Sequence, residues 1–216
     1  MTDSAAPAAD ALQPLALFPL RQVLFPGARL ALRVFEARYL DLVADCLRRG
    51  APFGVVCLTE GDEVRRGSAT VRFARTGVLA RIDAADAQQP GLLQLRCSGT
   101  QRFRLSGEPH TQADGLWVAP AQPLPDDAPV APPAALQPAV QALAQLIERL
   151  RAQGDEPFAP PLRLDDAGWV ANRWGELLPI ELALRQQLLE LDDGAQRLQR
   201  VQAHLAELGV LPAAGG

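Results

Sequence analysis

The 216-residue sequence contains no lysine, so all 21 of its basic side chains are arginines. Schiff-base catalysis, the lysine of a nucleotide-binding phosphate loop and a Ser–Lys dyad all need a side-chain amine. The sequence therefore argues against each of these chemistries. Heavy use of alanine, leucine and proline beside arginine is typical of a GC-rich coding sequence.

Histidine, cysteine and aromatic residues are also scarce. The two histidines, His110 and His204, have no neighbouring ligands at metal-binding spacing. The three cysteines, Cys46, Cys57 and Cys97, each lie in an apolar run and form no CxxC pair. This pattern predicts small buried thiols in a reducing compartment rather than a disulfide framework or a zinc site. We expect no metal and no other cofactor.

Long apolar runs are missing as well. No stretch approaches the ~18–20 apolar residues of a membrane helix, and the N-terminus lacks the basic region of a signal peptide. We therefore expect a cytoplasmic protein with no membrane partner. A net charge of −4 disfavours a general nucleic-acid binder.

Residues 64–104 nevertheless carry eight arginines, among them Arg65 and Arg66, against two aspartates. Arg72, Arg102 and Arg104 alternate with apolar neighbours, which predicts that these arginines form the solvated outer face of a β-sheet. The alternative is that this face binds an acidic peptide or a polyanion.

The first half of the sequence predicts short strands with one helix inserted early. The expected strands are 15–20, 28–34, 53–58, 69–84, 92–98, 102–106 and 116–119. The 69–84 segment is expected as one long strand or a pair broken at Thr76-Gly77, and Gly99 is expected to separate two strands. The 15–20 strand is expected to be cut by Pro19.

Residues 36–49 predict a helix with Tyr39, Leu40, Val43 and Leu47 on its apolar face. This order predicts a small, mostly antiparallel β-barrel-like subdomain.

The second half predicts helices. An amphipathic pattern runs from Leu136 to Leu150, Asp165 or Asp166 can cap a helix through both Trp169 and Trp174, Pro179 suits the first turn of the next helix, and Asp192 or Asp193 can cap the last. The chain is thus expected to be α+β. We expect a disordered tail at 1–14, a β-rich subdomain at 15–122, a proline-rich linker at 123–133 and a helical bundle at 134–210.

Several motifs together resemble the substrate-binding domain at the N-terminus of Lon proteases. They are Leu17-Phe18-Pro19-Leu20-Arg21, Val23-Leu24-Phe25-Pro26-Gly27, Leu32-Arg33-Val34-Phe35-Glu36-Ala37-Arg38-Tyr39-Leu40, Phe53-Gly54-Val55-Val56, Gly99-Thr100-Gln101-Arg102-Phe103-Arg104, Leu177-Leu178-Pro179-Ile180 and Gln187-Leu188-Leu189-Glu190. The resemblance implies a β-rich part followed by a helical part, and recognition of unfolded or tagged proteins. Full Lon proteases add ATPase and Ser–Lys protease modules, whose motifs this sequence does not contain. We therefore expect a stand-alone member that binds polypeptides without cutting them.

Eight residues are candidate binding residues: Arg21, Phe25, Arg33, Glu36, Arg38, Tyr39, Arg102 and Arg104. The favoured function is non-catalytic recognition of unfolded or extended polypeptide at an exposed strand edge. An adaptor or regulator of ATP-dependent proteolysis, with protease components as partners, is one form of it. Glu36 is expected in the first turn of its helix, with Arg21 or Arg33 as an ion-pair partner.

Two alternatives stay open. One is an uncharacterised small-molecule enzyme or ligand-binding protein that uses the cleft between the subdomains, with Arg21, Arg33, Glu36 and Arg38 as the first residues to test. The other is a structural module that self-associates into a homo-oligomer through its helices.

Overall fold

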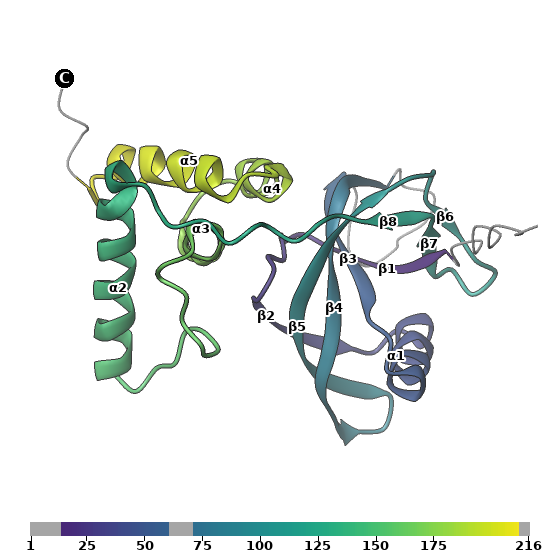
Figure 1. Cartoon of the computed structure of the whole chain (residues 1–216). Coiled ribbons are helices and arrows are strands. Elements are labelled where there is room, and N and C mark those ends of the chain that lie inside the picture. Colours follow the sequence, from purple (N-terminus) through teal and green to yellow (C-terminus); the bar gives the residue numbers. More distant parts are fainter. Residues whose placement is uncertain (1–13, 61–70, 212–216) are drawn as a thin grey trace, which may run out of the picture.

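The computed structural model describes residues 14–60 and 71–211, and it has a β-rich half and a helical half (Figure 1). Within these residues the strands are β1 (Leu15–Leu20), β2 (Arg29–Val34), β3 (Phe53–Glu60), β4 (Arg72–Gln89), β5 (Leu92–Leu105), β6 (His110–Thr111), β7 (Trp117–Ala119) and β8 (Ala121–Pro123). The predicted tail up to residue 13 and the arginines Arg65 and Arg66 lie outside the described residues.

The strands form one curled sheet that makes a half-barrel. Their order is β2-β5-β4-β3-β1-β7-β6, with β8 paired to β5 beside this path. All described pairings are antiparallel except that of β1 with β3. The α+β class and the mostly antiparallel sheet predicted from the sequence are confirmed.

Strands β4 and β5 are each longer than predicted, and they pair with each other as one long hairpin (Figure 1). β4 is one continuous strand through Gly77, which was the first of the two predicted alternatives, whereas the predicted break at Gly99 is wrong. A Cβ atom at Gly77 would lie 2.3 Å from the carbonyl oxygen of Val55, and one at Gly99 would lie 2.3 Å from that of Phe25. Glycine at these two positions therefore permits close approach of another backbone rather than ending a strand.

Pro19 does not cut β1 as predicted, because only one side of the strand is paired there. β7 pairs with Leu15 through Leu17, whereas β3 pairs with Leu17 through Leu20. A proline without an N–H is tolerated where a strand has an unpaired edge.

Helix α1 (Ala37–Arg49) begins where β2 ends and packs against the sheet. It stops as predicted at Gly50, whose φ of 64° is left-handed. Its predicted apolar face is partly wrong, since Leu47 is 51% exposed while Leu42 and Cys46 are buried. The helix is therefore rotated so that Tyr39, Leu42, Val43 and Cys46 meet the core.

The helical half contains η1 (Ala134–Leu136), α2 (Gln137–Ala152), α3 (Ala167–Leu177), α4 (Leu182–Glu190) and α5 (Gly194–Glu207). Asp166 and Asp193 cap α3 and α5, as predicted, by accepting backbone N–H bonds. Pro179 lies before α4 instead of in its first turn. An extended segment joins this half to the sheet (Figure 1). The predicted subdomain boundaries stay a prediction.

Helix α3 is the centre of the helical half, with every residue from Ala167 to Gly175 buried. The Trp174 indole donates a hydrogen bond of 3.0 Å to the Ala139 carbonyl, and Trp169 meets Phe158 edge to face. Both tryptophans therefore act in packing. None of the helices in the described part of the chain is long and apolar enough to span a bilayer.

Candidate functional site

A groove of about 290 Å³ lies between β1 and β2, in the segment that the sequence singled out. We call it the β2 groove. Its lining comes from the end of β1, from β2 and from the start of α1: Phe18, Leu20, Gln22, Ala31, Leu32, Arg33, Val34, Phe35, Glu36 and Tyr39. Three of the predicted site residues, Arg33, Glu36 and Tyr39, thus meet in one place.

Among the described residues, no strand pairs with the backbone edge of β2 that borders this groove. β2 lies at the end of the strand order of the described sheet, so only β5 pairs with it. The Ala28 carbonyl accepts a hydrogen bond from Gly99 at the β5 side. Because successive strand residues alternate in direction, Leu30 and Leu32 also face β5, whereas Arg29, Ala31 and Arg33 direct their N–H and C=O groups to the unpaired edge.

The floor of the groove is aromatic. Tyr39 and Phe18 are stacked with ring centroids 4.1 Å apart, and both are buried. The ring of Phe53 also packs near that of Phe18, with their centroids 5.8 Å apart. Phe35, in contrast, is 58% exposed at the end of β2. A large apolar side chain at the surface beside an aromatic floor is a feature that binding sites share.

Glu36 and Arg38 support the groove. Glu36 precedes α1 as its cap residue, but its carboxylate makes no cap hydrogen bond. It accepts one of 2.6 Å from Arg38. Arg38 also donates to the Gly115 carbonyl at 2.9 Å and lies 4.7 Å from the centroid of the Tyr39 ring. The Glu36 carboxylate is therefore paired with Arg38, a partner that was not predicted from the sequence.

Two further predicted residues do not line the groove. Arg21 is exposed next to the end of β1. Phe25 is fully buried and packs against Gly175 of α3. Its proposed role in binding is therefore wrong, because its ring fills the core between the two halves.

Arg102 corrects the prediction of a solvated arginine face. Its side chain is only 4% exposed. It donates to the carbonyls of Leu189 and Leu191 at 3.0 and 3.1 Å, and to Asp127 and Asp192 at 3.1 Å each. The helical half covers this part of β5. Arg104 is exposed on the same strand, far along β5 from its pairing with β2.

A second arginine completes this contact between the halves. Arg197 of α5 is 0% exposed, and it binds the Asp127 carboxylate at 2.5 Å and the Asn172 side chain at 3.0 Å. Asp127, which follows β8, thus holds one arginine from the sheet and one from the helices. We call Arg102, Asp127 and Arg197 the arginine clamp. No local sequence pattern predicted this clamp, because its three residues lie far apart along the chain.

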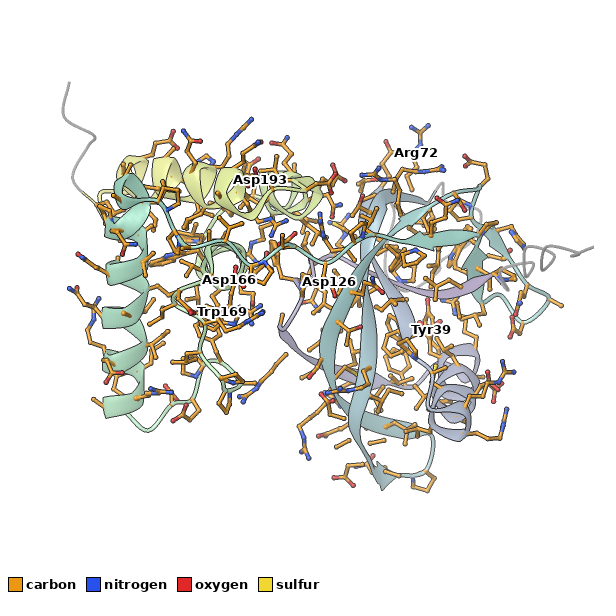
Figure 2. The ribbon with its side chains drawn as sticks, in the orientation of Figure 1. Tyr39, Arg72, Asp126, Asp166, Trp169 and Asp193 are labelled. Atoms are coloured by element: carbon orange, nitrogen blue, oxygen red, sulfur yellow. The ribbon has the colours of Figure 1, made fainter. Side chains whose placement is uncertain are left out.

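A hollow of about 400 Å³ lies beside the clamp, where the two halves meet. Asp166 and Trp169 line it from α3, and Asp126 lines it from the extended segment (Figure 2). The Asp166 carboxylate is engaged in capping α3 and lies 3.5 Å from Arg163. Glu36 and Arg33 are not part of this hollow, so the enzyme hypothesis and its named residues concern different places. That hypothesis stays a prediction.

Three buried groups have strongly shifted acidities. Burial raises the pKa of the Cys57 thiol to about 11 and that of Cys97 to about 12. Burial also raises the pKa of Glu176 to about 7, although Arg173 lies 2.6 Å away. Arg173 in turn donates to the carbonyls of Pro26 and Gly27 at 2.5 and 2.8 Å. These groups lie away from the β2 groove and hold the core.

No group of three or more His, Cys, Asp or Glu residues suited to a metal ion occurs among residues 14–60 and 71–211. The cysteines of this part of the chain are free and buried.

Comparison with known proteins gives concordant matches. The model of the family described as ATP-dependent protease La (LON) substrate-binding domain matches residues 14–207. Lon protease 2 of Herpetosiphon aurantiacus is 25% identical over 198 residues, which are 89% of this chain and 24% of that protein. This chain therefore spans about a quarter of the length of that relative.

Two solved structures are similar over most of their length. A Lon N-terminal domain protein from Xanthomonas campestris is 35% identical with a TM-score of 0.69, covering 88% of this chain and 98% of that one. The N-terminal domain of the Mycobacterium avium complex Lon protease gives a TM-score of 0.59 at 17% identity, covering 88% and 96%. The second match supports the fold alone.

Proposed function

Because this chain belongs to the family of LON substrate-binding domains, we propose that it recognises extended polypeptide segments, and that the β2 groove is where they bind. The observation that carries the proposal is the unpaired edge of β2 next to an aromatic floor. A peptide strand can add to such an edge through main-chain hydrogen bonds, which tolerate many sequences.

The backbone supplies the general part of the affinity. Arg29, Ala31 and Arg33 offer their N–H and C=O groups to an added strand, as the Ala28–Gly99 bond indicates. Each such hydrogen bond makes a net contribution of about 0.5–1.5 kcal/mol to the binding free energy. An extended segment that pairs along β2 is therefore held without any particular side chain.

The groove supplies the selective part. A side chain that enters it meets Phe18, Leu20 and Tyr39, with Phe35 at the rim. Burial of one large apolar side chain contributes about 1.5–3 kcal/mol. Unfolded proteins expose both free backbone and apolar side chains, whereas folded proteins hide them, so this site favours unfolded polypeptide.

We place this recognition in ATP-dependent proteolysis, as an adaptor or regulator with protease components as partners. The similarity to Lon protease 2 and to Lon N-terminal domains supports this role. Binding through an edge strand and an apolar groove requires no cofactor.

The decisive variant is Ala31→Pro. Ala31 has an exposed side chain and directs its N–H to the unpaired edge, so proline there leaves the pairing with β5 intact. The ring removes one donor and blocks the approach of an added strand. Ala31→Thr is the matched control, because threonine keeps the N–H and favours strands.

We expect Ala31→Pro to weaken binding of a fluorescent extended peptide by at least about tenfold in anisotropy titrations, which corresponds to the loss of one or two hydrogen bonds. Ala31→Thr should bind like the parent chain, and both variants should keep its circular dichroism spectrum. Equal affinity of the proline and threonine variants would remove the β2 edge from the proposal.

The role in proteolysis needs its own assay. The chain is added to an ATP-dependent Lon protease that degrades an unfolded reporter, and the initial rate is followed. An adaptor or regulator changes this rate, and Ala31→Pro abolishes the change. A rate that is the same with and without the chain would refute the adaptor role while leaving peptide binding in place.

A further inference from the structure

We propose that the segment bound at β2 alternates apolar and acidic residues, with its acidic side chains held by Arg33 and Arg96. This inference rests on the proposed function, because it specifies which polypeptides the β2 groove selects. It follows from the two faces that an added strand would present.

A strand added to β2 extends the sheet, so its side chains alternate in the same way as those of β2. The burial of β2 residues alternates strictly, with Leu30, Leu32 and Val34 buried and Arg29, Ala31 and Arg33 exposed. One set of ligand side chains therefore lies over the apolar groove, and the other lies on the outer face beside Arg29 and Arg33.

The outer face next to this edge carries arginines without acidic partners. Arg33 and Arg96 are exposed, and neither has an ion pair or side-chain hydrogen bond within the described residues. Both line a hollow of about 490 Å³ across β2, β5 and β4, in which Asp86 is the acidic residue. Arg29 donates only to a backbone carbonyl, that of Glu156, at 3.0 Å.

Three other exposed arginines of the sheet differ in this respect. Arg81 lies 2.9 Å from Asp83, Arg72 lies 3.2 Å from Glu60, and Arg75 lies 2.8 Å from Glu108. Arg104 also has no ion pair among the described residues, but it lies far along β5, so Arg33 and Arg96 are the two that lie where an added strand would run.

The register fixes the spacing of the acidic residues. Ala31 pairs with Arg96 and Arg33 pairs with Gln94, so Arg96 and Arg33 are diagonal neighbours on one face. A carboxylate on the added strand can reach Arg33 beside it, and one two residues away lies nearer Arg96. The guanidinium fork binds a carboxylate through two parallel bonds. The selected pattern is therefore acidic at every second position with apolar residues between.

The test uses three short fluorescent peptides that share leucines at alternate positions and carry Glu, Gln or Arg at the positions between. They are titrated into the full chain by anisotropy, at low and high salt. The proteins are the parent chain, the double variant Arg33→Glu/Arg96→Glu, and Arg200→Glu as a control at an exposed arginine of α5.

We expect the Glu peptide to bind the parent chain about tenfold more tightly than the Gln peptide at low salt, with the ratio falling to about twofold in 0.5 M NaCl. The double variant should reverse the order and prefer the Arg peptide. Arg200→Glu should leave the order unchanged.

Three outcomes overturn the proposal in distinguishable ways. If the three peptides bind equally while Ala31→Pro still weakens their binding, the acidic preference is wrong and the edge-strand function stands. If no peptide binds the parent chain, both fail. Equally tight, competitive binding of a single-stranded oligonucleotide with the same charge would also overturn it, because the arginines would then select charge rather than a peptide strand.

Discussion

Replacing Asp127 with asparagine should loosen the contact between the sheet and the helices. The carboxylate lies 3.1 Å from Arg102 and 2.5 Å from Arg197. Asparagine has nearly the same shape, so the change removes the negative charge with little loss of packing. It leaves two guanidinium groups facing each other around a neutral amide.

The burial of the two arginines sets the magnitude. Their side chains are 4% and 0% exposed, so water cannot replace the missing charge. Loss of one partner from a buried ion pair costs about 3–5 kcal/mol. Asp192 still contacts Arg102 in the variant, but this aspartate is 70% exposed and compensates weakly. We therefore expect Asp127→Asn to lower the free energy of unfolding by about 3 kcal/mol.

Asp126 provides a matched control in the preceding position. It is exposed and has no ion pair within residues 14–60 and 71–211. Asp126→Asn should change the stability by less than about 0.5 kcal/mol. Both variants are unfolded in urea and followed by circular dichroism and by tryptophan fluorescence, to which Trp169 and Trp174 of the helical half and Trp117 of β7 contribute. Equal stability losses in the two variants, or a loss below about 1 kcal/mol in Asp127→Asn, would refute the role of the arginine clamp.

Three further predictions concern the core. The native cysteines, including Cys57 and Cys97 with pKa values of about 11 and 12, should resist a thiol-reactive dye at pH 8 and react once urea unfolds the chain. Glu176, with a pKa of about 7 against 4.5 when unfolded, binds its proton more readily in the folded chain, so its contribution to stability is present at low pH and lost as pH rises through 7. Between pH 5 and pH 8 the free energy of unfolding should fall by about 2 kcal/mol from this group, and Glu176→Gln should remove that part of the slope. Gly77→Ala should destabilise the chain by about 1–3 kcal/mol, because the new methyl group would meet the Val55 carbonyl; unchanged urea midpoints would contradict this.

Local patterns in the sequence were sufficient for much of the fold. The alternation of 28–34 predicted β2, and Gly50 and Asp193 marked a helix end and a helix start, because each signal depends on neighbours within a few residues. Gly99 misled the same reasoning. Glycine is needed at this position because the carbonyl of Phe25 lies too close to leave room for a side chain. Phe25 is far away in the sequence and comes close only in the folded chain.

Only some residues of the candidate site were predicted from the sequence. Arg33, Glu36 and Tyr39 were predicted because they surround one strand–helix junction. Phe18 and Leu20 were missed, although they belong to the motif that resembles Lon domains, because a short apolar strand gives no sign of which residues face a groove. Arg102 was placed on the solvated face because its strand alternates there, and the helices that cover it lie 87 to 90 residues away along the chain.

Strand β5 links the edge strand β2 to the arginine clamp. Its first half pairs with β2, and its second half carries Arg102 into the arginine clamp. This 14-residue strand is paired with β4 along most of its length, so its two ends are held in place relative to each other. A polypeptide bound along β2 would therefore be held in one orientation relative to α5.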